Sequence, residues 1–185
     1  MNQFDLTIIA GGDSLRGFDF SQIPGEVWAI NWAAKHMVDL GVKPDRLIHF
    51  DKFQQGYPTN ISTETIVPHF GEWFNRGEYI NREPGCVGNL NSSMIFAVNV
   101  ALNKGYRNIV VLGADQRGCR HWYDPIETNI AWNFDLFETF LWLLAEHLKK
   151  RPGEMVTLVE SAAKRWPRER KISMEQYKNI IGYVK

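Results

Sequence analysis

The chain has 185 residues, which is enough for one well-filled α/β core and too few for two such domains. Lys plus Arg equals Asp plus Glu at 21 each, so no overall field attracts nucleic acid or an anionic membrane surface. No apolar run reaches the ~18 residues of a membrane span, no secretory leader pattern begins the chain, and Cys86 and Cys119 lack metal-type spacing. We therefore expect one cytoplasmic domain, residues 1–185, with a small molecule as partner and an oligomeric state that the sequence leaves open.

An apolar, β-branched run at residues 6–10 predicts a buried strand that leads directly into a small-residue turn. Gly11 and Gly12 let a ligand approach the backbone without a Cβ in the way. Asp13 and Ser14 add side-chain oxygens and backbone N–H groups, which suit a bound phosphate or carboxylate. The alternative is a tight turn that Asp13 or Ser14 only caps, because the turn lacks the Gly-x-Gly-x-x-Gly spacing and a Walker lysine.

Two further strands are predicted at residues 26–30 and 46–51, with a helix at residues 32–40 between them. Three strands joined by a loop and a helix imply right-handed crossovers and a parallel sheet. Ligands bind beyond the carboxyl ends of parallel strands, so the glycine turn, Asn31 and Asp51 are expected to line one crevice.

The pattern loosens over residues 52–84, where only residues 64–68 have strand character. We expect an irregular segment there that covers part of the crevice. A strongly apolar helix is predicted at residues 93–104, directly after Ser92. Asn91, Ser92 or Ser93 could cap this helix, and the serines could instead contact a ligand at its N-terminus.

The clearest internal strand, residues 108–112, leads into a loop at residues 113–124 that holds most of the side chains suited to chemistry. These side chains are Asp115, Arg117, Arg120, His121 and Tyr123. A histidine is the usual general base near neutral pH, the arginines could neutralise a phosphate, and the tyrosine could donate to a leaving group. The alternative is a solvated connection whose aromatic residues fold inward.

A helix at residues 131–150, a strand at residues 155–159 and a helix at residues 173–183 complete the pattern. This alternation predicts an α/β fold, a Rossmann-like three-layer domain with a mostly parallel sheet. The strand cores are expected at residues 6–10, 27–30, 47–50, 109–112 and 156–159.

Several stretches carry a resemblance to known families. They are IIAGGDSL (residues 8–15), AINW (29–32), GVKPDRLIHFD (41–51), the helix that begins at Ser92 and Ser93, and GYRNIVVLGAD (105–115). In this order they resemble the bacterial sialyltransferase-like group and the related flagellin-glycosylation and hydroxymethylpterin diphosphokinase-like proteins. The resemblance covers most of residues 6–124, the closing VESA (159–162) and the last helix. It implies a modified Rossmann sheet with the nucleotide of a donor, such as a CMP-sugar, over the glycine turn.

The resemblance implies a donor site at the ends of the strands. The sequence departs from the family pattern in two places. Asp13 stands where the family turn usually has Asn or Gly followed by Pro-Ser, and a carboxylate beside a donor phosphate repels it unless a cation intervenes. The sialyltransferases carry a longer lid and a downstream histidine base, for which His121 is the only candidate in the loop. The implied donor-binding residues are Gly11, Gly12, Asp13, Ser14, Asn31, Ser92 and Ser93, with Asp51 and Asp115 closing two strands as in the pterin-type proteins.

The sequence thus predicts a small transferase that uses a nucleotide-activated donor, of glycosyltransferase type with a CMP-sugar. Two alternatives stay open: a non-catalytic nucleotide- or protein-binding module on the same fold, and a pterin-type diphosphokinase. No resident cofactor or metal is expected, although His49, Asp51 and Asp115 could hold a divalent ion. The predicted catalytic residues are His121, Asp115 and Tyr123, and the predicted binding residues are Gly11, Gly12, Asp13, Ser14, Asn31, Asp51, Ser92, Ser93, Arg117 and Arg120.

Overall fold

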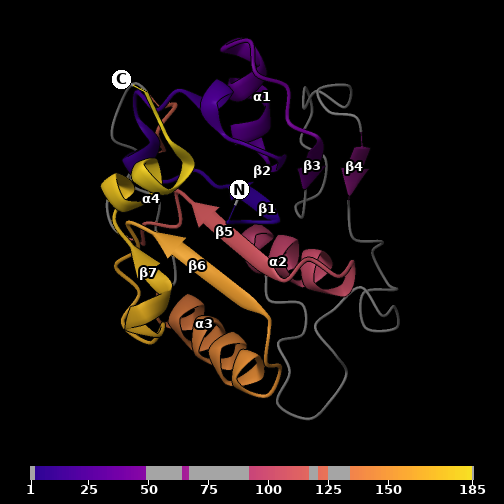
Figure 1. Cartoon of the computed structure of the whole chain (residues 1–185), viewed down its shortest axis with the longest axis vertical. Coiled ribbons are helices and arrows are strands. Elements are labelled where there is room, and N and C mark those ends of the chain that lie inside the picture. The colour runs from indigo at the N-terminus through magenta and orange to yellow at the C-terminus, as the bar shows by residue number, and fades with distance from the viewer. Residues whose placement is uncertain (1–2, 49–63, 67–91, 117–120, 125–133, 185) are drawn as a thin grey trace.

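A parallel sheet runs through the chain in a computed structural model, which describes residues 3–48, 64–66, 92–116, 121–124 and 134–184 (Figure 1). The seven strands lie in the order β4-β3-β2-β1-β5-β6-β7, and each neighbouring pair is parallel. This confirms the predicted α/β Rossmann-like fold. The strands are β1 (Leu6–Ile9), β2 (Glu26–Ile30), β3 (Arg46–Ile48), β4 (Glu64–Ile66), β5 (Asn108–Leu112), β6 (Met155–Val159) and β7 (Lys171–Ile172), and the helices are α1 (Trp32–Asp39), α2 (Ser93–Asn103), α3 (Phe134–Lys149) and α4 (Met174–Ile181).

The order of the strands reverses between β1 and β5. From β1 the chain builds the sheet outward through β2, β3 and β4, and it then re-enters at β5, on the other side of β1. Ile9 pairs with Ala29 of β2 and with Leu112 of β5, so the loops that follow these three strands begin side by side at one edge. In open α/β sheets, ligands bind at such a reversal.

Two layers of helices enclose the sheet (Figure 1). One core contains Leu6 and Ile8 together with residues of α2 and α3. The other contains Ile9 together with residues of α1 and α4. Alternate residues of β1 therefore face opposite layers, and burial on both faces explains why the inner strands are almost entirely apolar.

The edge strand β7 is absent from the sequence-based prediction. It consists of only Lys171 and Ile172, both half-buried, which pair with Leu158 and Val159. A strand is predicted from the alternation of apolar and polar residues over several positions, and two residues are too few to show it. The helix that follows is well marked, because Ser173 and Gln176 form a reciprocal capping box at its start.

A polar cluster joins the amino ends of the strands, opposite the edge that carries the predicted site. The Glu26 carboxylate accepts hydrogen bonds from the Trp28 indole, at 2.8 Å, and from the Tyr106 hydroxyl, and it forms an ion pair with Arg46. The Arg46 guanidinium also lies 5.0 Å from the centre of the Trp28 ring. Burial alone would raise the pKa of Glu26, but the hydrogen bonds and the charges of Arg46 and Lys104 hold it below its ordinary value.

Glu26→Gln is expected to lower the free energy of unfolding by about 1–2 kcal/mol near neutral pH, because an amide cannot accept from all three partners. A carboxyl group with a depressed folded pKa stabilises the fold above its ordinary value, here 4.5, and that contribution is lost as the pH falls through the folded value. Urea unfolding should therefore show the variant and the wild type converging at acid pH. Glu169→Gln, an exposed control, should change stability by less than about 0.5 kcal/mol, and an equal effect of both variants would contradict the assignment.

Candidate functional site

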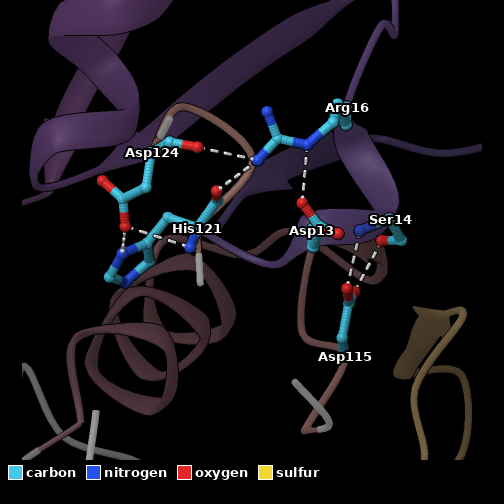
Figure 2. Close-up of polar contacts among 6 residues, drawn as sticks. All are labelled: Asp13, Ser14, Arg16, Asp115, His121 and Asp124. Carbon is cyan, nitrogen blue, oxygen red and sulfur yellow. Dashed lines mark hydrogen bonds and ion pairs between the residues drawn. The ribbon is translucent and has the colours of Figure 1, made fainter. Parts of the chain in front are cut away.

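The candidate site lies where β1 and β5 end, at the reversal of strand order. The turn after β1 continues into a short 3-10 helix, Asp13–Leu15. The Ser14 hydroxyl donates to one oxygen of the Asp115 carboxylate at 2.5 Å, and the Ser14 backbone N–H donates to the other at 2.7 Å (Figure 2). Asp115 is only 5% exposed. The two hydrogen bonds to this buried carboxylate therefore connect the turn after β1 to the loop after β5.

Gly12 makes this contact possible because a side chain there would occupy the space of Asp115. A Cβ on Gly12 would lie 2.5 Å from the Asp115 Cγ and 2.5 Å from the Gly113 carbonyl oxygen. The Gly12 N–H donates to that same carbonyl at 2.8 Å. Its φ of −62° suits any residue, so space rather than backbone conformation requires glycine here.

Residues 121–124 pack directly against the glycine turn. Gly12 and His121 form an antiparallel bridge, and the Trp122 N–H donates to the Gly11 carbonyl at 2.9 Å. The Trp122 indole N–H donates to the Ala10 carbonyl at 3.2 Å. The Trp122 ring is buried and lies 4.8 Å from the Phe20 ring, centre to centre, so it serves as an anchor of this segment in the core.

His121 and Asp124 form a hydrogen-bonded pair at the edge of the turn. The Asp124 carboxylate lies 2.8 Å from the His121 Nδ1 and also accepts the His121 backbone N–H at 3.1 Å (Figure 2). The two side chains are 27% and 24% exposed. A carboxylate at Nδ1 favours the tautomer that carries its proton on that nitrogen, which leaves Nε2 as the basic nitrogen.

Tyr123 stacks on two imidazole rings. Its ring centre lies 4.5 Å from that of His36 and 4.9 Å from that of His121, with interplanar angles of 10° and 4°. Burial, and then the charge of Asp124, raise the pKa of the Tyr123 hydroxyl well above its ordinary value. The hydroxyl therefore stays protonated near neutral pH, and the ring is already engaged by neighbours within the chain.

A second group of predicted residues lies at the end of β2. Asn31 donates from its amide to the Ser93 Oγ at 3.1 Å, while Ser92 caps α2 by accepting the Ile95 N–H at 3.4 Å. Ser92 is thus occupied as a cap, one of the two roles expected for it. Asn31 has φ 49° and ψ −132°, a strained conformation at a sharp strand-to-helix turn.

All the non-glycine residues with positive φ in the described part of the chain follow the carboxyl ends of strands. They are Asn31 after β2, Gln116 after β5 and Glu160 after β6. Such conformations cost about 1–3 kcal/mol each and tend to gather at functional sites. The strained residues and the reversal of strand order therefore both indicate the carboxyl edge of the sheet as the place of a functional site.

The described structure brings most of the predicted site residues to this edge. Residues Asp51, Arg117 and Arg120 lie outside the described residues, as does nearly all of the predicted covering segment 52–84. The sequence interpretation missed Asp124 and Arg16, whose guanidinium pairs with Asp13 at 2.8 Å. The residues brought together are Gly11, Gly12, Asp13, Ser14, Asp115, His121 and Tyr123, with Asn31 and Ser93 at the adjoining strand end.

Neither a metal centre nor a membrane helix is found in the described parts of the chain. No group of three or more histidine, cysteine or acidic side chains there has an arrangement that could hold an ion. None of the helices described combines the length and the hydropathy needed to cross a bilayer.

His36 gives this region a pH dependence of stability. Burial and then the charge of Lys35 lower the pKa of His36, against the opposing effect of Asp39 and Asp124. A histidine with a depressed folded pKa stabilises the fold above its ordinary value of 6.5, and that contribution is lost as the pH falls below it. His36→Phe, which retains a ring to stack on Tyr123, should flatten the fall in stability below this pH in urea titrations. Equal slopes for variant and wild type would contradict this.

Comparison with known proteins shows a shared fold. No protein-family model and no curated protein sequence matches the chain. Among solved structures, a probable thiamine pyrophosphokinase from Staphylococcus saprophyticus matches 83% of the chain at 16% identity and a TM-score of 0.50. The MAf glycosyltransferase from Magnetospirillum magneticum matches 94% of the chain at 11% identity and a TM-score of 0.56. The sialyltransferase CST-II, solved with a trisaccharide acceptor and CMP, matches 83% of the chain at 14% identity and a TM-score of 0.41. The chain spans 63%, 34% and 79% of these proteins, respectively.

Two of these neighbours, a probable thiamine pyrophosphokinase and a glycosyltransferase, reach a TM-score of 0.50 or more. At such low identities, the relationship holds at the level of the fold. These two proteins thus share their fold with the chain. Any function must therefore be argued from the residues of the site.

Proposed function

We propose that the chain is a transferase that uses a nucleotide-activated donor bound at the reversal between β1 and β5. The observation that carries the proposal is the glycine turn after β1, held by Asp115 after β5, with the His121–Asp124 pair packed against it. Strand reversals with glycine turns are the usual nucleotide sites of such sheets. The transferase neighbours on the same fold are compatible with this assignment.

The donor would lie beside the glycine turn, because the spaces next to Gly11 and Gly12 are already filled by His121 and Asp115. Both donors of Ser14 are directed at Asp115, so Ser14 contributes chiefly by shaping the turn. The Arg16 guanidinium offsets the charge of Asp13, which removes part of the repulsion that a phosphate would meet there. Arg117 and Arg120, which lie between Asp115 and His121 in the sequence, are proposed to supply the remaining positive charge.

The proposed transfer joins an acceptor hydroxyl to the group carried by the donor, a sugar in the glycosyltransferase case. The acceptor oxygen forms the new bond to the anomeric carbon, the bond from that carbon to the phosphate oxygen breaks, and the nucleotide leaves with the bonding electrons. His121 takes the acceptor proton on Nε2, and Asp124 stabilises the resulting imidazolium. The protonated Tyr123 hydroxyl is available as a donor to the leaving phosphate.

Asn31 and Ser93 are proposed to contact the nucleoside. Their hydrogen bond places an amide and a hydroxyl together at the end of β2, beside the glycine turn. Both groups can donate and accept, which suits recognition of a base edge or a ribose hydroxyl. Asp51 is proposed for the same crevice from its place at the end of the β3 sequence.

A ligand screen tests this function. Thermal unfolding is measured with CMP, UDP, GDP, ATP and CMP-sialic acid, and a nucleotide at 100 times its dissociation constant should stabilise the fold by about 2.7 kcal/mol. Hydrolysis or transfer is then followed by phosphorus NMR for any donor that binds. Stabilisation by none of these compounds would reject the proposal. Pyrophosphoryl transfer from ATP would favour the diphosphokinase, and binding without turnover would favour the non-catalytic module.

A further inference from the structure

Arg16 connects the glycine turn to both ends of the segment that carries the proposed base. One terminal nitrogen of its guanidinium donates to the His121 carbonyl at 3.0 Å and to the Asp124 carbonyl at 3.0 Å, and its Nε donates to the Asp13 carboxylate at 2.8 Å (Figure 2). Residues 121–124 also form a turn of their own, because the Asp124 N–H donates to the His121 carbonyl at 3.1 Å. Arg16 therefore donates hydrogen bonds to the first and the last carbonyl of this turn.

The chemistry of the contact favours arginine. A planar guanidinium presents several donors in a fixed geometry, so it can bind two carbonyl oxygens and a carboxylate at once, whereas a lysine ammonium has no rigid fork. Both carbonyl oxygens are neutral, so the positive charge of the guanidinium is what strengthens these two hydrogen bonds. The Asp13 carboxylate pairs with Nε and thereby fixes the orientation of the guanidinium.

The turn that Arg16 holds determines how Asp124 meets His121. A single oxygen of the Asp124 carboxylate accepts both the His121 backbone N–H and the His121 Nδ1–H. This double contact requires the two residues to keep the spacing of the turn. A shift of the Asp124 backbone would move its carboxylate away from Nδ1, and His121 would lose the group that selects its tautomer.

We propose that Arg16 is a positioning residue that holds the His121–Asp124 pair against the glycine turn. It thereby links the place where a donor would bind to the orientation of the proposed base. The inference deepens the proposed function and rests on it for catalysis, but the geometry of the histidine can be measured without any substrate.

The test measures the tautomer of His121 by NMR in protein labelled with ¹⁵N at its five histidines, with the His121 signals identified from a His121→Gln variant. In the wild type, His121 should carry its proton on Nδ1 when neutral. Arg16→Gln should give a mixture of tautomers and a weaker link to Asp124, and Arg16→Lys should restore the wild-type state only in part. Asp13→Asn is the matched control for the tautomer, because it removes the charge of the carboxylate while an amide oxygen can still accept from Nε and the two carbonyl contacts remain.

A folded Arg16→Gln protein with an unchanged His121 tautomer would overturn the inference, whatever the ligand screen finds. The side chain of Arg16 is 40% exposed, so we expect the variant to fold, and Arg16→Lys provides the same comparison if it does not. With an active donor, Arg16→Gln should lower kcat about 10-fold or more; kcat is measured at saturating donor, because the uncompensated charge of Asp13 also weakens donor binding. Arg165→Gln, an exposed arginine beyond β6, should leave kcat and KM unchanged, and an equal loss of kcat in this control would also count against the inference.

Discussion

Gly12→Ala is expected to destabilise the fold by about 3 kcal/mol and to abolish nucleotide binding. The new Cβ would lie 2.5 Å from both the Asp115 Cγ and the Gly113 carbonyl oxygen, which is closer than real contacts allow. One of these atoms belongs to the backbone, and the other to a buried carboxylate that already accepts two hydrogen bonds. Neither can move without opening the junction between β1 and β5. Urea unfolding and the ligand screen measure the two effects.

Gly11→Ala is the matched control for this prediction. A Cβ on Gly11 would collide chiefly with the His121 imidazole, a partly exposed side chain that can shift at the cost of its contacts with Asp124 and Tyr123. We therefore expect a stability loss of about 1 kcal/mol from Gly11→Ala, together with an altered His121 signal. Equal losses from the two substitutions would mean that the Ser14–Asp115 contact is not what makes Gly12 necessary. Ser14→Ala should cost little in a Gly12→Ala background, because the contact is already broken.

The fold could be predicted because its inner strands are buried on both faces. Residues of β1, β5 and β6 form near-continuous apolar runs, and a run of strand length between helical patterns indicates a parallel sheet. The predicted helices begin within three residues of those observed. Among the strands of the described residues, β7 was missed, because a pair of half-buried residues at the edge leaves no pattern.

The site could be predicted only in part, because its contacts join residues far apart in the chain. Ser14 and Asp115 are 101 positions apart, and Arg16 and His121 are 105 apart. The carboxyl ends of parallel strands lie at one edge of the sheet, so Ser14 and Asp115 could be assigned to one edge from the sequence. That Ser14 directs both its donors at Asp115 depends on the three-dimensional packing of the turn, which no spacing encodes.

Asp124 and Arg16, which the sequence interpretation missed, each lie three positions after the residue with which they pair. Asp124 follows His121 by three positions, a spacing that lets a carboxylate reach back to an imidazole across a single turn. Arg16 follows Asp13 by the same spacing, which also suits an ion pair. Each pair could have been noticed in the sequence, but its orientation toward the glycine turn follows only from the bridge between Gly12 and His121.

His121→Ala is expected to lower kcat by about 10²- to 10⁴-fold while nucleotide affinity stays within about 3-fold of the wild type. General-base catalysis acts in the transition state and contributes little to ground-state binding. Asp124→Asn should lower kcat less severely, because an amide can hold the ring but presents no charge to the imidazolium. Turnover and affinity are measured separately, by steady-state kinetics and by calorimetric titration, with whichever donor the ligand screen identifies.

Arg120→Ala is the contrasting variant, since a phosphate-binding guanidinium acts in both the ground state and the transition state and its loss should weaken affinity and turnover together. If His121→Ala instead weakens affinity and turnover by the same factor, His121 contacts the donor and the proton is taken by another group.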